Sequence, residues 1–308
     1  MPGEAPPWLW IPITLAAALA QTFRNAAQRH LTKELGTLGA TLVRFLYGMP
    51  FAALWLVAVL AVAGLPLPMP GAEALGWTII GAVGQIVATA LLLRTMEERN
   101  FAVGVVYSKT EVVQIALFAI VLLGDPLSFL TAVAIVLATV GLILLSPRAS
   151  DGPAGGRPAW LSMAALYGLG SGASFAISVV GYRGAALALD TESLFVAAAT
   201  VLVWAQAIQV LLLGGWLWAR HPAVVRAVLR AWRLSLLAGF MGAAGSAGWF
   251  TAMALEPVAH VRTLGLVEVL FSLLVSRRIF KERIGMRELA GIALVVLGVL
   301  LIIVTRAH

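Results

Sequence analysis

Apolar runs of membrane-spanning length recur along this chain from one end to the other. A helix that crosses the hydrocarbon core of a bilayer needs about 20 mainly apolar residues. On this basis the sequence predicts ten transmembrane helices, near residues 8–31, 36–63, 74–96, 101–123, 127–146, 159–187, 192–219, 233–255, 258–279 and 286–304. We therefore expect an all-α integral membrane protein with ten transmembrane helices.

The composition excludes most soluble folds. Of the 308 residues, 61% are hydrophobic and 11% are charged, whereas soluble domains carry about 25% charged residues. So few charges could not cover the surface of a soluble protein of this size. Lipid must therefore be the solvent for much of the chain.

The net charge of +7 does not indicate a nucleic-acid partner, because the Lys and Arg residues lie in short groups between the apolar runs. The sequence has no cysteine, and its four histidines lack the spacing of a zinc site. We expect no metal ion and no cofactor. The expected partners are a small-molecule solute and the lipid bilayer, and the expected state is a monomer, with a dimer as the alternative.

The two halves of the sequence are related to each other. An ungapped alignment with an offset of 157 residues (268 − 111) places Glu111 on Glu268. The same alignment pairs Asp125 with Glu282 and Gly141 with Gly298. The longest polar stretch separates the two copies and is the natural linker. We predict a first five-helix repeat at 1–146, a linker at 147–158 and a second five-helix repeat at 159–308.

The number of helices in each repeat has a consequence for the architecture. Five is odd, so the second repeat enters the membrane upside down relative to the first. Inverted repeats place a solute site near the membrane midplane, between the halves, and permit alternating access. We expect two inverted five-helix repeats around a central cavity.

Lys and Arg residues in the connections predict the orientation. The odd-numbered connections hold fifteen of the 21 Lys and Arg residues, and the even-numbered connections and both termini hold only Arg183, Arg262 and Arg306. Positively charged loops stay in the cytoplasm. The count predicts that both termini are periplasmic.

Polar residues within an apolar span usually face a partner or a cavity, because lipid makes them costly. In the first span Gln21, Arg24, Asn25 and Gln28 recur at spacings of three and four, which places them on one helix face. One guanidinium with three amides could receive the carboxylate of a solute. The alternative is that Arg24 and Gln28 lie near the helix end and extend to the interface.

Two glutamates are candidates for both substrate binding and proton coupling. In the fourth span Tyr107, Glu111 and Gln114 share one face, and Glu268 is the repeat mate of Glu111. A buried carboxylate pair could bind an ammonium group, carry protons or hold helices together.

Four more side chains complete the candidate substrate site. Tyr47 shares a helix face with Arg44, for which an interfacial position is the alternative. Ser174 lies in a stretch of small residues that permits close helix approach. Trp204 and Trp249 lie deep in their spans, where they could stack on a ring, accept a cation or pack in the core.

No motif in the sequence indicates an enzyme. It contains no G-x-x-x-x-G-K-[ST], no G-x-S-x-G and no H-E-x-x-H. We expect a transporter rather than an enzyme. The alternatives are a multidrug or nucleotide-linked metabolite carrier and, from another class, an intramembrane lipid-modifying enzyme or scaffold.

The segments "KTEVVQIALFAIVLLGDPLSF" and "GLVEVLFSLLVSRRIFKERIGMRELAGIALVVLGVLLI" resemble the repeats of the EamA-type branch of the drug/metabolite transporter superfamily. Glu111 and Glu268 match the Glu that opens a helix in each repeat, and Glu282 matches the acid of the following break. Asp125 and Lys281 depart from the usual pattern of that break.

This resemblance implies a bacterial inner-membrane protein that exports amino acids or related metabolites, as a secondary carrier or a facilitator. Within the branch the chain is most similar to the YddG-type aromatic amino-acid exporters. Glu111 or Glu268 would then receive the ammonium of the solute, and Tyr107, Trp204 and Trp249 its side chain.

Overall fold

The computed structural model describes residues 6–98, 111, 114, 121, 128–145, 163–280 and 285–306. All regular secondary structure in these ranges is helical, so the all-α class is confirmed. Within them, four helical stretches are long and apolar enough to cross a bilayer: Trp10–Ala63, Ala72–Thr95, Leu194–Arg220 and Trp232–Leu255. The total of ten stays a prediction, because the predicted span at 101–123 lies outside the described residues apart from three positions.

Large apolar side chains are exposed on the outside of these helices. Val62 is 91% exposed, Met286 82%, Phe129 81% and Leu211 73%. Leaving apolar surface in water costs about 25 cal/mol per Å², whereas lipid tails solvate it. The surface therefore fits a multi-pass membrane protein.

The first predicted span and the start of the second form one bent helix, α1 (Trp10–Leu46). Its helical geometry breaks at Gly36, which has a φ of 69°. Glycine adopts this left-handed conformation without a Cβ clash. The Gln28 side chain donates to the Ala40 carbonyl (2.9 Å) and so links the two parts of α1 across the bend.

The second predicted span contains another break, which the sequence analysis does not anticipate. The chain turns at Tyr47 and Gly48, and α2 (Met49–Ala63) then begins with Pro50 in its first turn. Proline suits that position, since the first N–H groups of a helix have no intrahelical partner. After a short connection, α3 (Ala72–Glu98) covers the third predicted span.

The next described helices are α6 (Phe129–Leu145) and α7 (Met163–Leu187). The span predicted at 192–219 is continuous but not uniform. It consists of α8 (Leu194–Gln209), a π-helical segment (Val210–Gly214) and α9 (Gly215–Arg220).

A short helix, α10 (Pro222–Arg230), follows where the sequence analysis expects only a connection. Its Val225 and Val228 are buried and its Arg226 and Arg230 are exposed. A short helix with one apolar and one basic face is typical of a segment that lies along a membrane interface.

The remaining helices are α11 (Trp232–Leu255), α12 (Val258–Leu264), α13 (Val267–Phe280) and α14 (Met286–Arg306). The span predicted at 258–279 is therefore divided into α12 and α13. The division lies at Gly265, where an added Cβ would meet the Trp249 ring at 2.3 Å.

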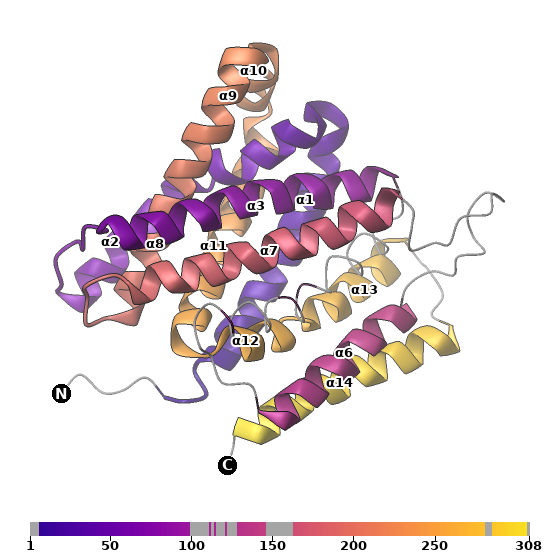
Figure 1. Ribbon diagram of the computed structural model, residues 1–308. Coiled ribbons are helices and arrows are strands. Elements are labelled where there is room, and N and C mark those ends of the chain that lie inside the picture. Colours follow the sequence, from indigo (N-terminus) through magenta and orange to yellow (C-terminus); the bar gives the residue numbers. More distant parts are fainter. Residues whose placement is uncertain are drawn as a thin grey trace.

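The most extensive packing joins α3 with α7, α1 with α11, and α6 with α14 (Figure 1). Figure 1 shows α3 beside α7, and α6 beside α14, in each case from opposite parts of the sequence. The predicted repeat pairs α1 with α7, α3 with α11, and α6 with α14. The contact of α1 with α11 in one combination therefore corresponds to the contact of α7 with α3 in the other, and the contact of α6 with α14 joins two helices that are each other's repeat mates.

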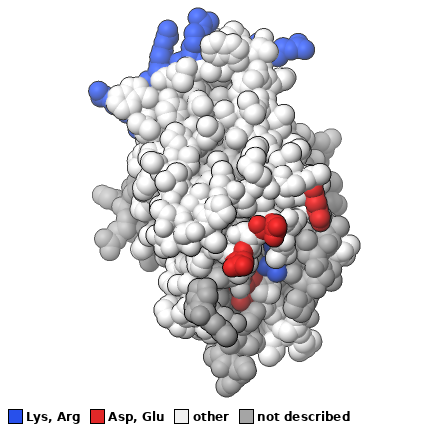
Figure 2. All heavy atoms as spheres, turned by 90° about the vertical axis from the view of Figure 1, so that its left-hand side faces the viewer, with Lys and Arg blue, Asp and Glu red and all other residues white. Residues whose placement is uncertain are grey.

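Charged side chains gather at different places on the molecular surface. Figure 2 shows Lys and Arg side chains at the end formed by α9 and α10, and Asp and Glu side chains on another part of the same face. The exposed arginines around α10 are Arg220, Arg226, Arg230 and Arg233. Glu73 is exposed in the first turn of α3, and Asp190 and Glu192 are exposed on the connection before α8.

Candidate functional site

Glu268 lies in the first turn of α13 and is only 1% exposed. Two amides from α1 donate to its carboxylate. Gln21 Nε2 lies 2.6 Å from one oxygen, and Asn25 Nδ2 lies 2.8 Å from the other. Both oxygens of the Glu268 carboxylate therefore accept a hydrogen bond from α1.

A chain of hydrogen bonds extends from these amides in two directions. Arg24 donates to Asn25 Oδ1 (2.8 Å), and the Trp249 indole N–H donates to Gln21 Oε1 (2.9 Å). Each amide thus donates to Glu268 and accepts from a second side chain. Trp249 comes from α11, which packs along α1 and brings the indole to this position.

A buried ion pair lies beside this network. Arg262 on α12 donates to Glu111 Oε1 at 2.7 Å, and both side chains are less than a tenth exposed. The Arg262 guanidinium also stacks over the Trp249 ring, with 4.7 Å to the ring centroid. Cations bind aromatic faces at this distance, so Trp249 contacts both the ion pair and the amide network.

Arg44 adds another buried guanidinium. It is 4% exposed and donates to the Thr89 hydroxyl of α3 (3.1 Å). A Cβ added at Gly242 would lie 3.4 Å from carbons of both the Arg24 and Arg44 side chains. The two arginines therefore converge on the surface of α11 at Gly242.

These side chains form one electrostatic unit, which we call the polar cluster. Arg24 interacts with the charges of Glu268, Arg262 and Glu111, and Arg44 with those of Arg24, Arg262 and Glu268. The polar cluster consists of Gln21, Arg24, Asn25, Arg44, Glu111, Trp249, Arg262 and Glu268. Its described members carry three guanidinium groups and two carboxylates.

Of the predicted site residues, Gln21, Arg24, Asn25, Glu111, Trp249 and Glu268 lie together in the polar cluster. Tyr47 lies elsewhere, with its hydroxyl 3.1 Å from the Val228 carbonyl of α10. The Ser174 backbone carbonyl packs against Gly84 of α3, at 3.0 Å from an added Cβ. Trp204 is half-buried on α8, and Tyr107 lies outside the described residues.

The prediction that Arg262 lies in a connection is wrong. Arg262 is 7% exposed and lies within α12, paired with Glu111. In the sequence, His260 and Arg262 lie close together near the start of a predicted span, so the segment that holds them resembles a polar connection between two spans. Arg262 therefore does not belong in the count of loop charges, and the orientation predicted from the connections stays a prediction.

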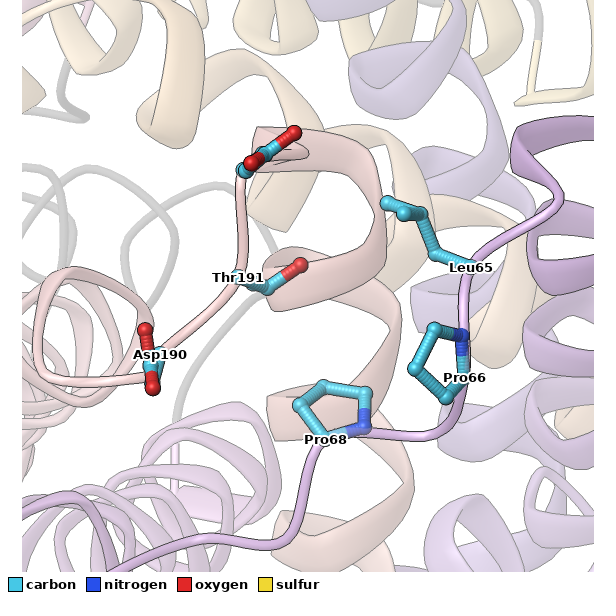
Figure 3. A pocket seen from close by; sticks show the side chains of 6 residues that line it. Leu65, Pro66, Pro68, Asp190 and Thr191 are labelled. Atoms are coloured by element: carbon cyan, nitrogen blue, oxygen red, sulfur yellow. The ribbon is translucent and has the colours of Figure 1, made fainter.

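A surface pocket lies away from the polar cluster (Figure 3). Leu65, Pro66 and Pro68, from the connection before α3, face Asp190, Thr191 and Glu192, from the connection before α8. None of its lining residues belongs to the polar cluster. In the part of the chain that the structure describes, His, Asp and Glu side chains do not gather into a metal site.

One comparison with known proteins identifies a family. The sequence profile of the EamA-like transporter family matches the chain twice, at residues 8–146 and 162–304. One crystal structure is similar over 97% of this chain and 97% of its own, with a TM-score of 0.67 and 16% sequence identity. At that identity the similarity shows the fold alone. No curated protein matches the sequence significantly.

Proposed function

This chain belongs to the EamA-like transporter family of the drug/metabolite transporter superfamily, and on that premise we propose that it exports amino acids, aromatic or other neutral ones. The proposed location is the bacterial inner membrane. The protein would act as a secondary carrier or facilitator, with the polar cluster as the solute site.

Alternating access fits the way the helices pack. We propose ten helices in two inverted repeats, 1–146 and 159–308, joined by the linker 147–158. The twofold match of the family profile supports the duplication. So does the reciprocal packing of α1 with α11 and of α7 with α3. In such an architecture the site between the halves opens first to one side and then to the other.

The charge of the polar cluster carries the substrate proposal. Its described residues include one more guanidinium than carboxylate, and a buried charge without a partner is costly. A solute carboxylate between Arg24 and Arg44, against Gly242, would neutralise that excess. The Nε of Arg24 is buried without a hydrogen-bond partner among the described residues, so it has donor capacity to spare.

The two glutamates would contribute differently to the site. Both oxygens of Glu268 accept amide hydrogens, and Glu111 is paired with Arg262. A solute ammonium would compete with Arg262 for Glu111, and the freed guanidinium would remain over Trp249. We retain Trp204 and Tyr107 as candidate contacts of the solute side chain, and Tyr47 and Ser174 as candidate lining residues.

The exposed charges support the proposed orientation. We propose that the basic end at α9 and α10 faces the cytoplasm and that both termini are periplasmic, in accord with the retention of positive charge inside. Asp190 and Glu192 would then lie on the periplasmic side, in the pocket of Figure 3.

Flux of labelled phenylalanine into proteoliposomes tests the proposal. The purified protein should carry phenylalanine saturably, and phenethylamine, which lacks the carboxylate, should not compete. Arg44→Gln should raise KM by about 10- to 100-fold, since a hydrogen bond to a charged group contributes about 1.5–3 kcal/mol. Arg226→Gln, on the exposed face of α10, removes the same charge elsewhere and should leave KM unchanged.

Absence of saturable flux for any amino acid would reject the substrate class. The same excess of guanidinium favours one alternative, a carrier of phosphorylated or nucleotide-linked metabolites, and disfavours carriers of lipophilic cations. Competition by such phosphorylated solutes but not by amino acids would select that alternative.

A further inference from the structure

A second group of buried polar side chains lies outside the polar cluster. Glu256, between α11 and α12, is 4% exposed, and its carboxylate contacts His260 Nδ1. The other imidazole nitrogen, Nε2, lies 2.9 Å from the Thr131 hydroxyl of α6. One imidazole thus connects a buried carboxylate of the second half to a hydroxyl of the first.

The hydrogen bonds continue from Thr131 to the molecular surface. Thr131 Oγ1 lies 2.9 Å from the hydroxyl of Ser128, which is exposed at the start of α6. Thr131 is only 1% exposed and His260 is largely buried. Ser128, Thr131, His260 and Glu256 therefore form a continuous chain from solvent to a buried carboxylate.

Each hydroxyl in this chain can both donate and accept, so the chain can carry a proton. With neutral imidazole, Nδ1–H donates to Glu256 and Nε2 accepts from Thr131. An incoming proton is taken up when Ser128 accepts it from water and passes its own proton to Thr131. Thr131 in turn protonates Nε2, and the pair changes from one net negative charge to neutral.

The groups that surround the pair come from α6, α7 and α12. From α6, the groups that face His260 are the hydroxyls of Thr131 and Ser128, and the described side chains of α6 include no ionisable group. From α7, the Arg183 guanidinium donates to the carbonyls of Met253 and Glu256, at 2.7 and 3.1 Å. On α12 itself the charged neighbour is Arg262, which is paired with Glu111.

Three further helices, α1, α11 and α14, pack against α12. Counted from the first residue of α1, the first ionisable side chain of that helix is Arg24, which belongs to the polar cluster. On α11 the one ionisable residue is Arg233, at the opposite end of the helix. On α14 the described ionisable side chain is Arg287, at the end away from α12's contact with Thr131.

We propose that His260 and Glu256 form a proton-binding site that couples solute export to proton entry. The pair spans Pro257, the joint between α11, which carries Trp249, and α12, which carries Arg262. Protonation of His260 changes its hydrogen bond with Thr131, which joins α12 to α6, and so changes the position of α12. Because Arg262 lies two residues from His260, this movement reaches its ion pair with Glu111. This inference rests on the proposed function for its solute.

Solute accumulation driven by a pH gradient tests the coupling. The full-length protein is placed in liposomes whose lumen is one pH unit more acidic than the bath, with the membrane potential clamped, and labelled phenylalanine is added outside. One proton per solute would support about tenfold accumulation. His260→Gln and Glu256→Gln should abolish accumulation and retain downhill exchange.

His221→Gln is the matched control, since His221 is exposed beside α10, and it should accumulate as the wild type does. Tenfold accumulation by His260→Gln would overturn the inference, as would wild-type flux without accumulation. The second result would leave the proposed function intact.

A titration that needs no solute separates failure of the coupling from failure of the substrate proposal. In protein with ¹⁵N-labelled histidine, the signal absent from His260→Gln should change from the neutral to the protonated form when the protein is acidified. An imidazole that stays neutral throughout would overturn the inference even if no amino acid is carried.

Discussion

Gly141 of α6 and Gly298 of α14 each pack against the backbone of the other's helix, in the same register. A Cβ added at Gly141 would lie 2.7 Å from the Gly291 carbonyl oxygen, and one added at Gly298 would lie 2.8 Å from the Ala134 carbonyl oxygen. Gly298 and Gly291 lie 157 residues after Gly141 and Ala134, respectively. The two contacts are therefore exchanged by the alignment that pairs Glu111 with Glu268.

Alanine at either glycine should destabilise the protein. The added methyl group would meet backbone atoms that cannot rotate away, and overpacking of this kind costs about 1–3 kcal/mol. We expect Gly141→Ala and Gly298→Ala to lower the melting temperature of the detergent-solubilised protein by similar amounts. Gly76→Ala adds the same methyl group to α3 where nothing lies within 4 Å, and it should be neutral or slightly stabilising. Equal melting temperatures for all three variants would contradict the close contact.

The reciprocal glycines show what a sequence repeat can predict. The spacing from Glu111 to Gly141 and from Glu268 to Gly298 indicates equivalent helices, but not that those helices pack on each other. Likewise, a spacing of three and four residues places Gln21, Arg24 and Asn25 on one face of α1. Only the tertiary packing of α13 brings Glu268, from the far half of the chain, to that face.

The buried ion pair between Glu111 and Arg262 should contribute strongly to stability. Removing one partner leaves the other charge buried, which costs about 3–5 kcal/mol. We expect Glu111→Gln or Arg262→Gln alone to lower the melting temperature markedly, and the double variant to recover part of the loss. Arg94→Gln, which breaks the exposed pair with Glu97, is the control and should have little effect. A double variant as unstable as the sum of the two singles would exclude direct coupling.

Trp249 combines two interactions that different substitutions separate. Trp249→Phe keeps a ring under Arg262 but removes the N–H that binds Gln21, whereas Trp249→Leu removes both. A hydrogen bond and a cation–π contact each contribute about 0.5–2 kcal/mol. We expect KM for phenylalanine to rise about threefold in Trp249→Phe and more in Trp249→Leu. Trp232→Leu, at the exposed end of α11, should not change KM. An unchanged KM in Trp249→Leu would remove Trp249 from the proposed site.

Several features could not have been derived from apolar runs. The polar residues Lys33 and Glu34 predict a connection between two spans, whereas α1 continues through them and bends at Gly36. Hydropathy also merges α12 with α13 across Gly265. It also treats α10 as a loop, since a segment that mixes valines with arginines has a low average hydropathy even when it forms one apolar and one basic face. Hydropathy also misplaces Arg262. A charged residue near the end of a span is interpreted as a loop residue until its buried partner, here Glu111, is located.

The absence of native cysteine allows the orientation to be measured directly. Single cysteines at Glu192, in the pocket before α8, and at Arg226, on α10, are both exposed and lie at opposite ends of the span Leu194–Arg220. If positive charge holds α10 in the cytoplasm, a membrane-impermeant maleimide applied to intact cells should label Glu192→Cys and not Arg226→Cys. After permeabilisation both should be labelled. Labelling of Arg226→Cys alone in intact cells would reverse the orientation, and with it the side from which protons reach Ser128 and His260.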